Sequence, residues 1–351
     1  MNAEITFRTQ TYLNPNANPA PTAANIELLK QAIYRLSSDP KLANHPIRRY
    51  LNDPKLKAEI IFDNPRANGG AEADDKQIYI SSSRDLPYYL EMLIHEFIHT
   101  DMSSKYVSSI FHYSFLKPED FAFRNLMEEA FANAIEAWGR FIYPEFPHNL
   151  QIRNWQQQSA KRNIADALKS DLKATTNLSD EQINARVAAE IFNTLMTKPT
   201  TYTLETIPNN MDEAYKQLNT FLIPEYAFYS SRGDALLRHM WNHLASMMPF
   251  ELPRDKNFDY YRARFKSDVA DWARYASSPE ESIQYWLNYD YRNNALKKLN
   301  AQNLVDQRYD YLSREDEEKL NKVMKEIDPY FIPVNTANDE WRIWQERQPK
   351  R

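Results

Sequence analysis

Hydrophobic residues recur at helical spacing along most of this chain, and two short stretches have the composition of strands. Apolar residues three and four positions apart in NIELLKQAIYRLSS (25–38) predict a first helix. The stretches AEIIFD (58–63) and KQIYIS (76–81) are rich in β-branched and aromatic residues. The turn-rich segment between them predicts a short sheet or a hairpin. Residues 1–24, rich in Asn, Pro and Ala, are expected to form a flexible N-terminal arm.

The rest of the pattern predicts helices. The next begins after Asp85, a suitable N-cap with Pro87 in the first turn, and another covers 120–142. Ser179 and Gln182 have the spacing of a capping box and predict a helix start. Further helices are expected at 211–222, 234–248, 258–275, 279–299 and 314–327. The fold class is therefore mainly α (α+β), with a small sheet followed by a helical C-terminal region.

Composition supports this fold class and excludes several functions. The chain has 4 Gly and 20 Pro, which argues against a sandwich or barrel with many tight turns. A net charge of -5 argues against a nucleic-acid partner, because phosphate binding needs a basic face. There is no Cys, so disulfides and thiolate ligands are excluded. We expect no transmembrane segment, since no run of 18 apolar residues occurs, and the N-terminus lacks the pattern of a signal peptide.

The stretch HEFIH, His95 to His99, carries the strongest chemical signal. Positions four apart on a helix differ by about 40° in direction, so both imidazoles project from one face and can reach one Zn²⁺. Glu96 lies about 100° round the helix from His95, where it can orient a water molecule and take its proton. The motif therefore predicts a zinc site with a catalytic base. The alternative is a pair of ordinary helix histidines satisfied by their neighbours.

Catalytic zinc usually has three protein ligands, so one more is needed. The metzincin pattern is excluded, because Met102 and Lys105 stand where it needs Gly and His. Downstream, EEAFAN offers two adjacent glutamates, Glu128 and Glu129.

At this point the chain resembles the gluzincins, the thermolysin-like zinc peptidases, over roughly residues 76–140. Their second motif has the ligand glutamate three residues before a small residue and four before Asp or Asn. Glu129, Ala132 and Asn133 match that pattern. The resemblance implies Glu129 as third ligand and Asn133 as a residue behind the ligands that hydrogen-bonds a histidine. Whether Glu128 also contributes is left open.

Other histidines are weaker candidates. His239 and His243 repeat the four-residue spacing without the intervening Glu, so a second metal site is one reading. Gluzincins often supply a downstream His or Tyr as oxyanion stabiliser, and the resemblance makes His239 or His243 a candidate for that role. His45, next to a proline in a loop, is expected at the surface.

The residues favour a zinc-dependent endopeptidase acting on a protein substrate. Residues 25–148 would form the peptidase core, and 149–351 a helical domain for substrate recognition with a secretion signal. The alternative is a helical binding or regulatory protein whose zinc is structural. The whole chain also resembles actin-cleaving metalloprotease effectors that intracellular bacteria inject through a type IV secretion system. That resemblance implies actin as partner, and secretion without a cleaved signal peptide into the host cell cytoplasm, as a virulence factor.

Overall fold

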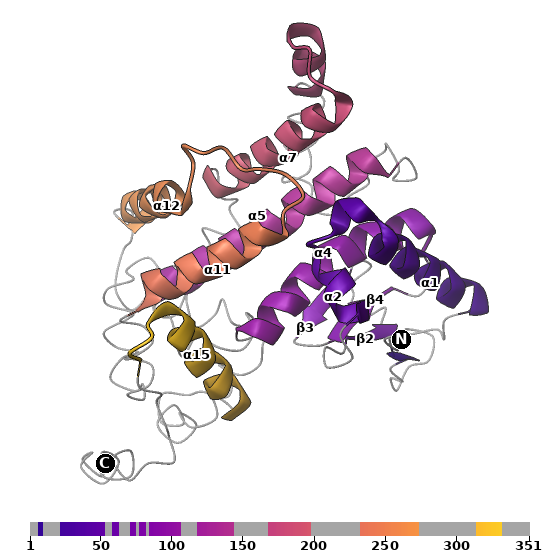
Figure 1. Ribbon diagram of the computed structural model, residues 1–351, viewed down its shortest axis with the longest axis horizontal. Coiled ribbons are helices and arrows are strands. Elements are labelled where there is room, and N and C mark those ends of the chain that lie inside the picture. Colours follow the sequence, from indigo (N-terminus) through magenta and orange to yellow (C-terminus); the bar gives the residue numbers. More distant parts are fainter. Residues whose placement is uncertain are drawn as a thin grey trace.

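The fold is mainly helical, as the sequence predicts, with one small sheet (Figure 1). The computed structural model describes residues 6–9, 22–52, 58–62, 71–74, 77–81, 84–106, 118–143, 168–197, 232–273 and 314–331. The helices are α1 (Ala23–Ser38), η1 (Pro40–Leu42), α2 (Pro46–Asn52), α4 (Leu86–Lys105), α5 (Pro118–Ile142), α7 (Asp180–Thr197), α11 (Gly233–Met247), α12 (Phe258–Ala273) and α15 (Arg314–Ile327). The helices expected at 211–222 and 279–299 lie outside the described residues. No helix in this part of the chain is long and apolar enough to cross a membrane.

The described sheet has four strands in the order β1-β2-β4-β3. They are β1 (Thr6–Thr9), β2 (Glu59–Phe62), β3 (Ala71–Asp74) and β4 (Gln77–Ile80). β1 pairs with β2 and β2 with β4 in parallel, whereas β3 runs antiparallel to β4 at the edge. β2 and β4 each have three consecutive buried residues, as expected of strands covered on both faces.

The structure corrects two details of the expected sheet. The stretches at 58–63 and 76–81 do not form a hairpin together, because β2 and β4 run parallel and β3 lies between them in the chain. β3 occupies a segment that turn residues had marked as a loop. The expected N-terminal arm is also not wholly irregular, since Thr6–Thr9 pair with β2 and α1 begins at Ala23.

Two helix starts follow the predicted capping chemistry. The Asp85 carboxylate accepts a hydrogen bond from the Tyr88 backbone N–H at 3.1 Å, with Pro in the first turn of α4. At α7, the Ser179 hydroxyl accepts from the Gln182 N–H at 3.2 Å, and the Gln182 side chain accepts from the Ser179 N–H at 2.9 Å.

α4 lies at the centre of the molecule. It packs against α1, α2, β3 and β4, and also against α5. α5 in turn contacts α7 and α11, and α15 packs on α11 (Figure 1). One hydrophobic core runs from Leu29 in α1 to Phe331 beyond α15. The domain division expected at 148/149 stays a prediction, and within the described residues elements on both sides of it share this core.

A buried arginine joins the starts of three helices. Arg262 of α12, 5% exposed, contacts Asp120 in the first turn of α5 and donates to Asp234 in the first turn of α11 at 3.0 Å. Gly233 lies against the Asp120 carboxylate, where a Cβ atom would clash. These contacts set where α11 begins relative to α5.

Candidate metal centre

His95 and His99 project from one face of α4, as the HEFIH spacing predicts. Their ring centroids are 4.9 Å apart, and the two Nε2 atoms are 3.1 Å apart. Both side chains are largely buried, with exposed fractions of 14% and 15%. The two imidazoles therefore point the same nitrogen toward one shared position.

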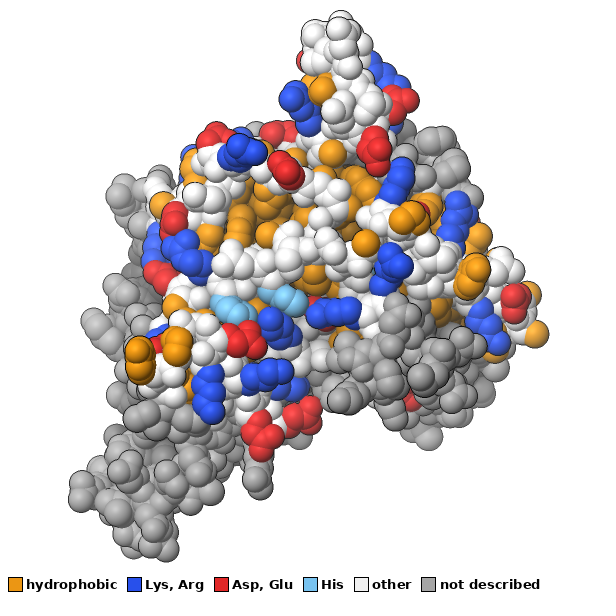
Figure 2. Space-filling view, in the orientation of Figure 1, with side chains coloured by type: hydrophobic (Ala, Val, Ile, Leu, Met, Phe, Trp, Pro, Cys, Tyr) orange, Lys and Arg blue, Asp and Glu red, His pale blue; other side chains and the backbone are white. Residues whose placement is uncertain are grey.

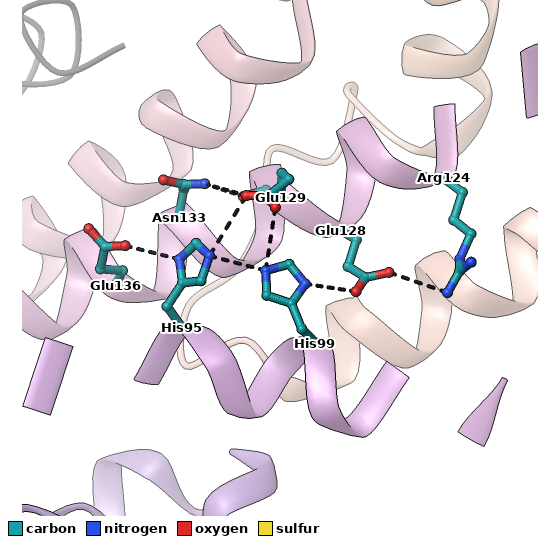
Figure 3. A network of polar contacts seen from close by, with 7 residues as sticks. All are labelled: His95, His99, Arg124, Glu128, Glu129, Asn133 and Glu136. Atoms are coloured by element: carbon teal, nitrogen blue, oxygen red, sulfur yellow. Dashed lines mark hydrogen bonds and ion pairs between the residues drawn. The ribbon is translucent and has the colours of Figure 1, made fainter. Parts of the chain in front are cut away.

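Glu129 of α5 faces these nitrogens (Figure 3). Its Oε2 lies 3.7 Å from His95 Nε2 and its Oε1 lies 3.5 Å from His99 Nε2. Ligand atoms of these three residues all lie within 4.8 Å of one another, which makes them a candidate metal-binding group. These are the same three residues that the sequence analysis named as metal ligands.

The distances between the three side chains fit a tetrahedral metal. With bonds of roughly 2.0–2.1 Å, two ligand atoms on a tetrahedral ion are about 3.3 Å apart. The Nε2–Nε2 separation of 3.1 Å and the carboxylate separations of 3.5 and 3.7 Å lie close to that value. The Glu129 side chain is 57% exposed, so the group opens toward solvent on the α5 side.

Two buried glutamates hold the other nitrogen of each imidazole. His95 Nδ1 lies 3.0 Å from Glu136 Oε2, and His99 Nδ1 lies 2.7 Å from Glu128 Oε1. Because a carboxylate accepts, each Nδ1 carries the hydrogen, and the Nε2 lone pair is directed at the shared position. Metal-bound histidines are usually supported in this way. The later histidine pairs with the earlier glutamate, so α4 and α5 run in opposite directions.

Sequence reasoning missed both supporting glutamates as histidine partners. Glu128 had been weighed only as a ligand, and its side chain is 2% exposed. Glu136 lies two helical turns beyond Glu129 on the same face of α5. Glu136, a lone glutamate inside the apolar stretch FANAIEAW (131–138), was a signal, since a buried carboxylate needs a partner.

Asn133 holds the carboxylate ligand. Its Nδ2 lies 3.3 Å from Glu129 Oε2 and 2.7 Å from the Glu129 carbonyl oxygen. The hydrogen bond to a histidine that the gluzincin resemblance implied stays a prediction, and these two contacts constrain the side chain of Glu129. The physical reason is the i, i+4 geometry of one helix, which brings Asn133 over the turn that carries Glu129.

The carboxylates make the site favourable for positive charge. Burial lowers the pKa of His95, but its hydrogen bond to Glu136 and nearby negative charges outweigh burial and raise that pKa. At His99 burial also lowers the pKa, and the charges of Glu129 and Glu128 outweigh it and raise the pKa to about 10. The same charges that stabilise a proton stabilise a metal cation, so the two compete for these imidazoles.

Glu96, the predicted base, is buried, with an exposed fraction of 6%. Its charge contributes to the raised pKa of both His95 and His99, so its carboxylate lies within electrostatic reach of the candidate ligands. Its role as the catalytic base stays a prediction.

His239 and His243 of α11 are engaged at the C-terminal end of α4. His239 Nδ1 lies 2.8 Å from the Tyr106 hydroxyl, and its Nε2 lies 3.1 Å from Glu326 Oε2. His243 Nε2 lies 2.7 Å from Asp101 Oδ2. Neither joins the metal group formed by the described residues. On the face drawn in Figure 2, histidine side chains reach the surface among charged groups.

His45 corrects a sequence-based prediction. It was expected at the surface, but it is 1% exposed. Its Nε2 donates to the Ile94 carbonyl oxygen at 2.9 Å, and its Nδ1 accepts from the Ile47 N–H at 3.3 Å. The ring thus links the first turn of α2 to the residue before His95, a tertiary contact that the loop sequence does not reveal.

Comparison with known proteins found no match among family models, curated proteins or solved structures.

Proposed function

We propose that the protein is a zinc-dependent endopeptidase. The observation that carries the proposal is the convergence of two Nε2 atoms and one carboxylate, with each Nδ1 held by a glutamate. Two imidazoles and one carboxylate are the ligand set of a common class of catalytic zinc site. A structural site would be closed by four ligands, whereas the Glu129 side chain is 57% exposed.

The residues divide the chemistry among them. His95, His99 and Glu129 would hold Zn²⁺, which supplies Lewis-acid activation of water and of the scissile carbonyl. Glu96 accepts the proton of the attacking water and passes it to the leaving amine. Glu136 and Glu128 keep the imidazoles oriented, and their charge increases the basicity of the ligand nitrogens.

An extended peptide is the proposed form of the substrate. β3 lies at the edge of the described sheet and packs against α4, the helix that carries the histidines. An edge strand can pair its backbone with an added peptide strand, which binds a protein segment with little regard to its side chains. Such pairing would place the scissile bond along α4.

Actin is the proposed substrate, in the cytoplasm of a host cell that receives the protein as a secreted effector. This choice depends on the resemblance to actin-cleaving effectors, and it is separate from the peptidase proposal. Cleavage of another host protein in place of actin would contradict the choice of substrate and leave the peptidase proposal standing.

The test compares Glu96→Gln with the unchanged protein and with Glu91→Gln, a matched change elsewhere on α4. Each zinc-loaded protein is incubated with purified actin and with host-cell lysate, with and without a chelator, and new protein termini are identified. We expect Glu96→Gln to lower cleavage by about 10²- to 10⁴-fold with zinc content unchanged. Equal cleavage by Glu96→Gln would refute the proposed base. Stoichiometric zinc without any cleavage would favour the structural-zinc alternative.

A further inference from the structure

A fully buried arginine stands behind the His99 ligand. Arg124 of α5 is 0% exposed, and its Nη2 lies 3.6 Å from Glu128 Oε2 (Figure 3). The other carboxylate oxygen, Glu128 Oε1, is the one that lies 2.7 Å from His99 Nδ1. The three side chains therefore form a line from guanidinium to carboxylate to imidazole.

The ion pair between Arg124 and Glu128 is buried, unlike a surface ion pair. Glu128 is 2% exposed, so both charges have left water, and neither would be retained without a compensating partner. The guanidinium attracts one carboxylate oxygen, which leaves the other directed at His99. Without that attraction, the Glu128 carboxylate could turn away from the imidazole, and the ring would lose the contact that sets its orientation and its protonated nitrogen.

We propose that Arg124 is a positioning residue for the metal centre, which holds the Glu128 carboxylate so that His99 presents Nε2 toward His95 and Glu129. The expected effect on Zn²⁺ binding rests on the proposed function. The orientation of His99 by Arg124 and Glu128 does not depend on a bound metal. Arg124 touches neither the metal group nor a substrate in this scheme, and it acts only through Glu128.

The chain supplies a matched control. Arg262 is also buried, at 5% exposure, and also pairs with carboxylates, those of Asp120 and Asp234. Its contacts join the starts of α5, α11 and α12 and not the histidines. Arg262→Met therefore carries the same loss of a buried charge as Arg124→Met, without the predicted effect on His99.

The first measurement needs no metal. The Nδ1 proton of His99, donated to a buried carboxylate, should give a downfield proton resonance that exchanges slowly with water in the metal-free protein labelled with ¹⁵N-histidine. We expect Arg124→Met to speed this exchange by tenfold or more, and Arg262→Met to leave it unchanged. An unchanged His99 resonance in Arg124→Met would overturn the proposal.

The second measurement is Zn²⁺ affinity by competition with a chelator. We expect Arg124→Met to lower affinity by about 10- to 100-fold, and Arg262→Met to stay within about threefold of the parent. Glu128→Gln and the double variant Glu128→Gln/Arg124→Met should bind Zn²⁺ equally, because Arg124 acts through Glu128. A further drop in the double variant would refute this route.

The two sets of measurements separate the possible failures. Should Arg124→Met not fold, Glu128→Gln and the double variant carry the test, since the double variant has lost both buried charges. A parent protein that binds no Zn²⁺ would overturn the proposed function, while the exchange rate of the His99 proton would still decide the role of Arg124.

Discussion

Replacing His45 with Gln should change how stability depends on pH. His45 is 1% exposed and donates from Nε2 to Ile94 O while Nδ1 accepts from Ile47 N–H. The contact with Ile47 requires the neutral ring, because a protonated imidazole has no acceptor nitrogen. Burial lowers the pKa of His45 from 6.5 to about 4, against a smaller opposing effect of the hydrogen bond to Ile94.

The sign and size of the effect follow from that pKa. A folded-state pKa below the unfolded value means that the unfolded chain binds the proton more readily. The stabilisation from His45 is therefore present above pH 6.5 and is lost as pH falls toward about 4. A shift from 6.5 to about 4 corresponds to about 3 kcal/mol, at 1.36 kcal/mol per pKa unit. Gln at this position has no titrating group and cannot lose this contribution.

Urea unfolding of both proteins at pH 7 and at pH 4, with a chelator present throughout, measures the difference. At pH 7, His45→Gln should be less stable than the parent by roughly 1–3 kcal/mol, the cost of imperfectly satisfied buried groups. That difference should shift by about 3 kcal/mol in favour of the variant on going to pH 4. Metal-site titration contributes equally to both proteins and cancels. Parallel stability curves for parent and variant between these pH values would refute the reasoning.

Three further substitutions test other parts of the structure. Zn²⁺ at 100 times its dissociation constant should stabilise the parent by about 2.7 kcal/mol, and calorimetry should find this gain absent in Glu129→Ala. Arg262→Met breaks the buried pairing with Asp120 and the contact with the more exposed Asp234, so denaturant unfolding should give a loss of about 3–5 kcal/mol; a loss below 1 kcal/mol would contradict the buried pairing. Gly233→Ala places a Cβ against the Asp120 carboxylate and should cost about 1–3 kcal/mol; an unchanged melting temperature would show that the contact is looser than described.

The two histidines of the candidate metal group were predictable because their geometry is local. His95 and His99 share a face of any helix that contains them, and Asp85 at the N-cap indicated that such a helix begins shortly before. The choice of Glu129 as third ligand required further information, since helix periodicity does not distinguish it from Glu128. The gluzincin-like spacing to Asn133 made that choice, and the structure brings Glu129 to the two Nε2 atoms.

What sequence reasoning missed depends on how elements pack. Glu136 and Glu128 reach the histidines only because α5 runs antiparallel to α4 in one register, which no local pattern encodes. His45 is buried because α2 lies across α4. β3 was hidden in turn-rich sequence, since a short edge strand is specified by its partner more than by its own residues.

The later helices also bear on the metal centre, beyond the role in substrate recognition expected for residues 149–351. Asp101, two residues after His99, contacts Arg49 of α2 on one side and accepts from His243 of α11 on the other. Tyr106, the residue that follows α4, hydrogen-bonds with His239 of α11. Because α11 also packs on α5, it contacts both helices that carry the ligands. The register between α4 and α5, which brings Glu129 to the two imidazoles, is therefore supported from outside the segment that carries the motif. A chain cut after α5 would keep every ligand but lose these contacts.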